Sequence, residues 1–373
     1  MNDNTGNVSY LPAAVASADP DEFLSSVLSG WKRQQLAKNF QPSTAKRRAS
    51  VVMRMATFIG KHPWEWLPAD CDDFFAHLRG VESCSHNTVR AYQSDVRTFL
   101  EYATSPAYDW NERCGQLFGT VFSPVVSEYN TATHKDETPD GKKRPFTTRE
   151  LQEFFDLADL EPERILNSGR KGALAAWRDA VMMKTMYSWG LRFSEARHLI
   201  PADFSRNVRS PGFGEWGVLR VRHGKSKKGS PPKQRTVLTV FDWSVDMLDH
   251  WTRVGLPRYG GHRATPLFPT GAGKMLDNSA LRRRLVALLD ELGFPPGLDL
   301  HSLRRSYATH LQTELGFDAG FAQLQLGHDN ASITGVYTIA APDYRARELS
   351  RVLSDTLQRS GATLSSPDTK ESR

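Results

Sequence analysis

The sequence has few cysteines and no long run of apolar residues. Its three cysteines, Cys71, Cys84 and Cys114, are odd in number and lack Cys-x-x-Cys spacing, which argues against a disulfide framework and against a zinc site. No apolar stretch reaches the roughly 18 residues that a membrane-spanning helix needs. The opening residues show no basic segment followed by an apolar one, so we expect no signal peptide. These absences favour a reduced, cytoplasmic protein.

Positive charge is modestly in excess. The 373 residues include 48 Lys and Arg against 42 Asp and Glu, a formal net charge of +6. Such an excess favours an anionic partner, most commonly nucleic acid. Placement is more informative than the total, because the segment from Arg220 to Arg235 holds seven basic residues and no acid. It could be a solvated loop tip, but cations of one sign are tolerated more easily beside polyphosphate. The candidate contacts from this segment are Arg222, Lys227, Lys228 and Lys233.

The patterning predicts two folded domains. Apolar residues recur at helical spacing over residues 20–125, which we interpret as an all-helical domain. Residues 126–144 are polar and rich in turn formers, as expected of a linker. Residues 145–358 alternate between helical segments and one β-hairpin, formed by "GVLRVRH" and "RTVLTV" around a basic loop. The fold class is therefore mainly α with a small antiparallel β-sheet in the second domain. The ends, residues 1–19 and 359–373, are expected to be disordered.

Local signals place several helix ends. Ser43 is a good N-cap for a helix that begins there, and Thr147 with Glu150 forms a capping box at the start of the second domain. In "LQLGH", Gly327 is expected to close a helix just before His328.

Two short motifs supply groups that could handle a phosphate. Arg192 follows a glycine turn and precedes a short helix in "WGLRFSE"; an arginine there opposes the helix dipole unless an anion is also present. His301 and Arg304 are three residues apart on a predicted helix, so they share a face and could donate to one phosphate oxygen. Each motif taken alone fits an ordinary surface position equally well. Tyr337 would need such a cationic site, because a phenol with a pKa of about 10 is a poor nucleophile at neutral pH.

Taken in order, the motifs resemble those of tyrosine recombinases of the phage integrase and Xer type. Such proteins carry an arginine in a "GLRxSE" turn, a lysine in a hairpin "GK" loop, a "HxLR" pair, a "LGH" histidine and a tyrosine nine residues later. This chain reads "GLRFSE", "HGKSKKG", "HSLR", "LGH" and "VY". The matching positions are Arg192, Lys225, His301, Arg304, His328 and Tyr337. The hairpin loop is longer than usual by "GSPP", so Lys227 and Lys228 remain alternatives to Lys225 as the catalytic lysine.

The resemblance implies a mechanism. Tyr337 would attack a scissile phosphodiester and form a 3′-phosphotyrosyl bond, with no metal, ATP or other cofactor. Arg192 and Arg304 would hold the non-bridging oxygens, and Lys225 would protonate the leaving 5′-oxygen. His301 would accept a proton or orient the phosphate, and His328 would hydrogen-bond to it. Glu195 would support the site from behind these groups, and Tyr344, which lacks the nine-residue offset from His328, is assigned to packing.

The resemblance also implies partners. The two domains would clamp double-stranded DNA at short core sites, because the stretch ahead of residue 20 is too short for an additional arm-binding domain. Candidate phosphate contacts in the helical domain are Thr44, Lys46, Arg47, Thr88 and Arg90, each of which could equally be solvated helix surface. A homo-tetramer on paired sites is expected. The last helix, residues 342–358, could pack on its own chain or, as the resemblance implies, dock on a neighbouring protomer. The alternatives are an inactive DNA-binding protein, or an activity like that of a type IB topoisomerase or a telomere resolvase.

Overall fold

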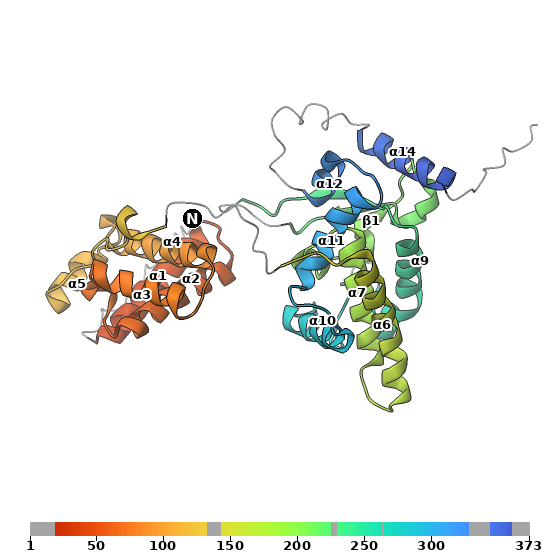
Figure 1. Ribbon diagram of the computed structural model, residues 1–373. Helices are drawn as coiled ribbons and strands as arrows, with labels where there is room; N and C mark the ends of the chain where they lie inside the picture. The colour runs from red at the N-terminus through yellow and green to blue at the C-terminus, as the bar shows by residue number, and fades with distance from the viewer. Residues whose placement is uncertain (1–18, 133–142, 225–229, 263–264, 328–343, 360–373) are drawn as a thin grey trace, which may run out of the picture. The chain divides into compact units, whose positions relative to one another are not determined.

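The computed structural model describes residues 19–132, 143–224, 230–262, 265–327 and 344–359. The predicted disordered ends lie outside this part of the chain, except for Asp19 and Arg359. The chain separates into two compact units, one holding helices α1 to α5 and the other the elements from α6 to α14 (Figure 1). Among the described residues, no helix combines the length and the apolar character that crossing a membrane requires.

The first unit is helical. Its helices are α1 (Pro20–Ala37), α2 (Pro42–Ile59), α3 (Pro68–Gly80), α4 (His86–Ala103) and α5 (Trp110–Phe118), with 3₁₀ turns at Pro63–Glu65, Pro106–Tyr108 and Glu128–Asn130. Asp19 and Ser85 cap α1 and α4 with their side chains. The predicted cap at Ser43 is wrong: α2 begins one residue earlier, at Pro42, because proline is already set for the first helical position, and Gln41 is the N-cap. Aromatic rings fill the core, where Trp31 packs edge-on against Phe99.

Residues 126–132 belong to this packed unit rather than to an exposed linker. The Gln93 side chain donates to the Asn130 carbonyl at 3.2 Å and accepts from the Ala132 N–H at 3.2 Å. Arg97 donates to the Thr131 hydroxyl at 2.8 Å. The predicted start of the linker at residue 126 therefore differs from the structure, because side chains of α4 satisfy the polar backbone of this segment.

The second unit is built around α7 (Ala173–Ser188), a helix buried along most of its length. The other helices are α6 (Thr148–Asn167), α8 (Phe193–Ala196), α9 (Trp243–His250), α10 (Asn278–Leu292), α11 (Leu300–Thr313), α12 (Ala319–Leu326) and α14 (Tyr344–Arg359). Shorter helical turns occupy Pro201–Asp203, Pro211–Trp216, Trp251–Gly255 and Leu256–Tyr259. In Figure 1, α6 and α11 lie beside α7. The predicted capping box is confirmed, with the Thr147 hydroxyl accepting from the Glu150 N–H at 3.2 Å.

A small antiparallel sheet completes this unit. The strands β1 (Phe204–Ser205), β2 (Val218–Val221) and β3 (Arg235–Leu238) lie in the order β1-β2-β3. The predicted hairpin is β2 and β3, with Val221 opposite Arg235. β1 was not predicted, because two residues are too few to show alternation. The predicted fold class, mainly α with a small antiparallel sheet, is confirmed.

The last helix packs on its own chain. Leu349 and Val352 of α14 are buried in the core of the second unit. Arg345 donates to the Thr236 carbonyl at 2.7 Å and to the Gln325 side-chain oxygen at 2.6 Å. In the isolated chain, α14 therefore docks in cis.

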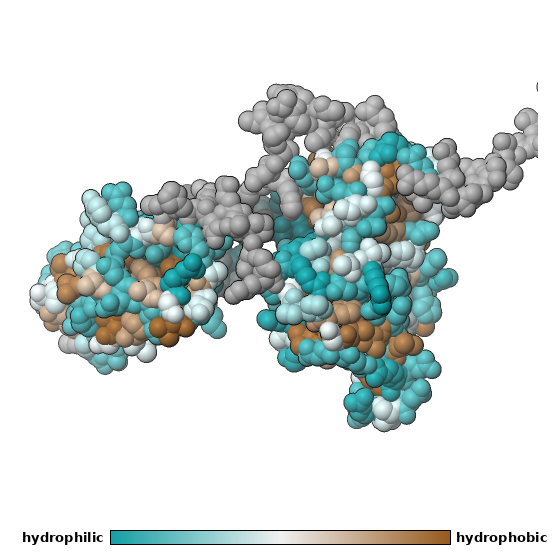
Figure 2. Space-filling model, in the orientation of Figure 1, coloured by the Kyte–Doolittle hydropathy of each residue, from teal (hydrophilic) through white to brown (hydrophobic). Residues whose placement is uncertain are grey.

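Figure 2 shows polar residues over much of the visible face of the second unit, with hydrophobic residues gathered in the region of α10 and α6. Exposed Leu160 and Leu166 of α6 and Val286 of α10 are among the exposed apolar side chains of this unit. Phe154, also on α6, is fully buried, and its ring centroid lies 5.3 Å from that of Phe146.

Phe154→Ala should lower the free energy of unfolding of the second unit by about 3–5 kcal/mol, because it opens a cavity in a closed core. Leu160→Ala, on the same helix but 55% exposed, is the matched control and should change it by less than about 0.5 kcal/mol. Urea unfolding of the full chain measures both. Equal shifts for the two variants would contradict the burial of α6 described above.

Candidate active site

The turn after α7 presents Arg192. Trp189 and Leu191 are fully buried, and Gly190 between them has a φ of +57°, a backbone conformation that glycine adopts without strain. A Cβ at position 190 would lie 2.4 Å from the Tyr307 ring. Both the positive φ and the close approach of Tyr307 therefore require glycine at position 190. The turn places Arg192 as the N-cap of α8.

Glu195 sits at the centre of the site. Its carboxylate accepts from the Arg192 N–H at 2.9 Å and from the Arg192 guanidinium at 2.8 Å. Arg235 binds both carboxylate oxygens, at 2.8 and 2.9 Å, and Arg304 lies 3.7 Å away. The side chain is 0% exposed. The anion that the sequence led us to expect beside Arg192 is, in the free chain, this carboxylate.

Two guanidinium groups and one backbone N–H keep Glu195 ionised. Burial alone would raise its pKa, but Arg235, the Arg192 N–H and Arg304 outweigh burial and lower the pKa of Glu195 to about 2. The carboxylate is thus fully charged at any physiological pH.

Arg304 reaches the same place from α11. Its terminal nitrogens donate to the Gly190 carbonyl at 2.5 Å and to the Leu326 carbonyl at 2.7 Å. Burial, with Arg192 and Arg235 nearby, lowers the pKa of Arg304 to about 9, so the guanidinium stays protonated at neutral pH. Arg304 therefore ties the turn before Arg192 to the end of α12.

His301 lies in the first turn of α11 and is exposed. Partial desolvation, followed by the charges of Arg305 and Arg304, lowers its pKa below the ordinary histidine value. Arg192 acts in the same direction. The lowered pKa favours the neutral imidazole, which is the form that can accept a proton.

Three cations from different elements bind the carboxyl end of α12. The Gln325 carbonyl accepts from Arg235 at 2.9 Å, the Leu326 carbonyl from Arg304 at 2.7 Å and the Gly327 carbonyl from Lys233 at 3.3 Å. Cations at this end complement the helix dipole. Gly327, with a φ of +67°, ends the helix as predicted.

The remaining predicted catalytic residues, Lys225, His328 and Tyr337, lie outside the described residues, as do Lys227 and Lys228. The choice of catalytic lysine therefore stays a prediction. The structure does bring together Arg192, Glu195 and Arg304, with His301 close enough to respond to both arginines.

Arg222, a predicted DNA contact, is half-buried and paired with an acid of its own unit. It donates to both carboxylate oxygens of Asp203, at 2.5 and 3.0 Å. This pair joins β2 to the turn at Pro201–Asp203, which gives Arg222 a structural use.

The predicted contacts of the helical unit lie on α2 and α4. Lys46 is exposed, and Thr44 and Arg90 are half-buried. Arg47 is held by Asp95 at 2.5 Å, and Thr88 shares a hydrogen bond with the cap Ser85 at 2.9 Å. Asp95 also lies 3.2 Å from Arg48, so one buried acid orients two neighbouring arginines.

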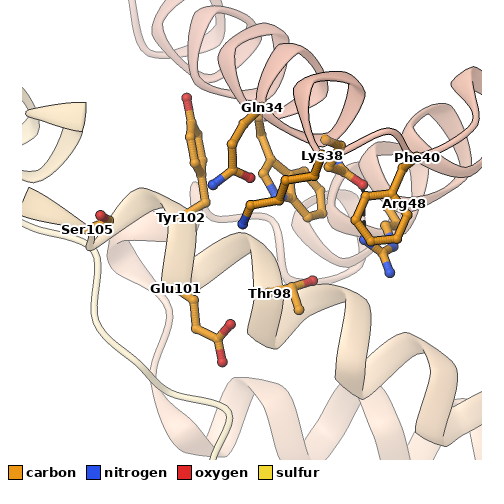
Figure 3. A pocket seen from close by; sticks show the side chains of 10 residues that line it. Gln34, Lys38, Phe40, Arg48, Thr98, Glu101, Tyr102 and Ser105 are labelled. Carbon is orange, nitrogen blue, oxygen red and sulfur yellow. Dashed lines mark hydrogen bonds between the residues drawn. The ribbon is translucent and has the colours of Figure 1, made fainter. Parts of the chain in front are cut away.

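A hollow of about 440 Å³ lies beside this ion pair (Figure 3). Its lining mixes aromatic, amide and charged side chains: Trp31, Gln34, Gln35, Lys38, Phe40, Arg48, Thr98, Glu101, Tyr102 and Ser105. Arg48 lies over the Phe40 ring at 4.7 Å. All of these lining residues belong to the first unit, whereas Arg192, Glu195, Arg235 and Arg304 belong to the second.

Sequence reasoning counted Arg235 among the loop cations and missed its place in the site. A signal was available, because side chains alternate along a strand. Arg235 shares a face of β3 with Val237, which is fully buried. An arginine on an inward-facing strand position requires a buried acid, and Glu195 is that acid.

Fold and site together define a mainly helical protein whose second unit carries a buried, net-cationic cluster suited to an anion. Residues 157–343 match the family described as "Phage integrase family", and residues 71–113 match "Phage integrase, N-terminal SAM-like domain". The chain is 31% identical to tyrosine recombinase XerC of Agrobacterium fabrum, covering 71% of this chain and 87% of that protein. It is 30% identical to tyrosine recombinase XerC of Proteus mirabilis, covering 85% and 88%. The chain therefore belongs to the phage integrase family of tyrosine recombinases.

Solved structures share the fold. A lambda integrase dimer bound to a COC′ core site matches with a TM-score of 0.55 at 14% identity, covering 86% of this chain and 78% of that one. XerH recombinase bound to palindromic difH substrate matches with a TM-score of 0.56 at 18% identity, covering 91% and 84%. A lambda integrase tetramer bound to a Holliday junction matches with a TM-score of 0.54 at 14% identity, covering 83% and 78%.

Gly190→Ala should destabilise the second unit more than Gly169→Ala does. Both glycines have positive φ, which disfavours alanine by about 1–2 kcal/mol, but a Cβ at Gly169 meets nothing within 4 Å. At Gly190 the clash with Tyr307 adds about 1–3 kcal/mol. Thermal unfolding of both variants measures the difference. Equal melting temperatures would contradict the packing of Tyr307 against this turn.

Proposed function

We propose that this protein is a site-specific DNA recombinase that cleaves and rejoins strands through a 3′-phosphotyrosyl intermediate. The observation that carries the proposal is the cluster of Arg192, Arg235 and Arg304 around the single acid Glu195. Three guanidinium groups against one carboxylate leave two positive charges in a largely buried place. A phosphodiester gains a second negative charge as it becomes pentacoordinate, so the surplus matches the transition state.

Each step exchanges one phosphate ester for another. The Tyr337 oxygen attacks phosphorus while the bond to the 5′-oxygen breaks. His301, in its neutral form, accepts the phenolic proton or orients the phosphate. Lys225 donates a proton to the leaving 5′-oxygen, and His328 hydrogen-bonds to the phosphate. A 5′-hydroxyl of the partner duplex then attacks the phosphotyrosine and releases Tyr337.

Arg192 and Arg304 hold the two non-bridging oxygens in this proposal. The terminal nitrogens of Arg304 bind the Gly190 and Leu326 carbonyls, so the guanidinium is oriented before DNA arrives. A fixed donor stabilises the developing charge without reorganising during the reaction.

For partners, we propose double-stranded DNA core sites that both the helical unit and the catalytic unit contact, in the cytoplasm. The helical unit would act as the core-binding domain, with Lys46, Arg47 and Arg90 on phosphates. Assembly would be a homo-tetramer on paired sites, an arrangement supported by the lambda integrase tetramer that shares the fold. Docking of α14 in trans would require it to exchange its cis contacts through Arg345, Leu349 and Val352.

The alternatives predict different products. A type IB topoisomerase-like enzyme would relax plasmids without a recombination site, and a telomere resolvase would leave hairpin ends. An inactive DNA-binding protein would form no covalent adduct at all. The intact set of candidate groups favours the recombinase.

Tyr337→Phe should abolish covalent attachment to DNA while leaving DNA binding nearly intact, because only the nucleophilic oxygen is lost. Tyr344→Phe, at the first residue of α14, is the matched control and should change neither covalent attachment nor DNA binding. The substrate is a duplex taken from the DNA that flanks the gene, at a site that footprinting shows the protein to bind. The duplex is nicked, so that the short strand released by cleavage diffuses away. An adduct that survives denaturing electrophoresis is the readout. Absence of an adduct with the wild type on every bound site would refute the catalytic assignment.

Lys225→Ala should slow cleavage of ordinary DNA by about 100-fold or more, in the range expected for loss of a general acid. A substrate whose bridging 5′-oxygen is replaced by sulfur has a leaving group that needs no proton, so the variant should cleave it at nearly the wild-type rate. Lys227→Ala and Lys228→Ala serve as controls and should be slowed on neither substrate. If instead one of these two variants is slow on ordinary DNA and regains its rate on the sulfur substrate, that lysine is the catalytic one.

A further inference from the structure

Arg235 is buried inside the site, and each of its three side-chain nitrogens binds an acceptor of the protein. Its two terminal nitrogens bind the two carboxylate oxygens of Glu195, and Nε donates to the Gln325 carbonyl at 2.9 Å. Its side chain is 8% exposed. Arg235 is therefore the described arginine of the cluster that binds both carboxylate oxygens of Glu195 with its two terminal nitrogens.

Glu195 would otherwise compete with the substrate. Its carboxylate lies 2.8 Å from the Arg192 guanidinium and 3.7 Å from that of Arg304. Both are proposed phosphate ligands, and an unneutralised buried carboxylate would draw both towards itself and repel the phosphate. Yet Glu195 is needed to cap α8 and to orient Arg192.

We propose that Arg235 is a positioning residue that neutralises Glu195, so that Arg192 and Arg304 keep their charge for the scissile phosphate. The inference rests on the proposed recombinase function. With Arg235 the cluster carries three positive charges and one negative charge; without it, Arg192 and Arg304 share their charge with Glu195 and a single surplus charge remains.

The geometry specifies arginine at this position. A guanidinium can bind both carboxylate oxygens in its plane and still direct Nε to a third acceptor, whereas an ammonium has no such fork. The third bond, to Gln325, also ties β3 to the end of α12, next to the carbonyls bound by Arg304 and Lys233. Arg235 thus links the acid to the helix that leads to His328.

The test compares Arg235→Gln, Arg235→Lys and the double variant Glu195→Gln with Arg235→Gln. Adduct formation is measured on the nicked bound duplex, alongside DNA affinity and thermal unfolding. Arg235→Gln should slow adduct formation by about 100-fold, as for loss of one transition-state charge contact. The double variant removes the acid and its neutralising cation together and so restores the surplus of two positive charges. Its rate of adduct formation should return to within about tenfold of the wild-type rate. Arg235→Lys, which keeps the charge but loses the fork, should fall between the two.

A purely structural role would make the double variant at least as slow as Arg235→Gln, since it disrupts more contacts. That outcome, or an Arg235→Gln rate within threefold of wild type, would overturn the proposal. If Arg235→Gln fails to fold, the double variant decides the question. A double variant that folds and binds DNA but forms the adduct more than 100-fold more slowly than the wild type would also overturn the proposal. Failure of the wild type to form an adduct is a different result and would refute the recombinase function instead.

Discussion

The carboxylate of Glu195 holds the catalytic unit's site together. It caps α8, orients Arg192 and binds β3 through Arg235, while Arg304 reaches it from α11. Burial of a charge is strongly unfavourable unless it is paired and hydrogen-bonded, so each of these elements must be in place for the carboxylate to be accommodated. The same constraint explains why the cluster is rich in arginine, whose planar fork satisfies several acceptors at once.

Much of this could be predicted from the sequence. Periodicity gave the helices and the β2–β3 hairpin, because amphipathic patterns survive tertiary packing, and the motif order gave Arg192, His301 and Arg304. Short or context-dependent features were missed. β1 is two residues long, the start of α2 was set by Pro42 rather than by Ser43, and residues 126–132 look like linker until Gln93 and Arg97 bind them.

The charged residues show the same division. A basic run in a sequence does not say which of its members are paired with acids, and Arg222 and Arg235 bind Asp203 and Glu195 of their own unit. Their partners lie 19 and 40 residues away, beyond the reach of local rules. Strand alternation could have marked Arg235 as inward-facing, whereas the exposed end of the hairpin offered no comparable sign for Arg222. Counting cations therefore overstates the charge available to DNA.

The three bound carbonyls at the end of α12 make the site depend on complete folding. Their donors are Arg235 at the start of β3, Lys233 just before that strand, and Arg304 of α11. The carboxyl end of α12 therefore gains all three donors only when the hairpin and α11 are both in place. A chain that has folded only in part lacks this arrangement, and its site is incomplete.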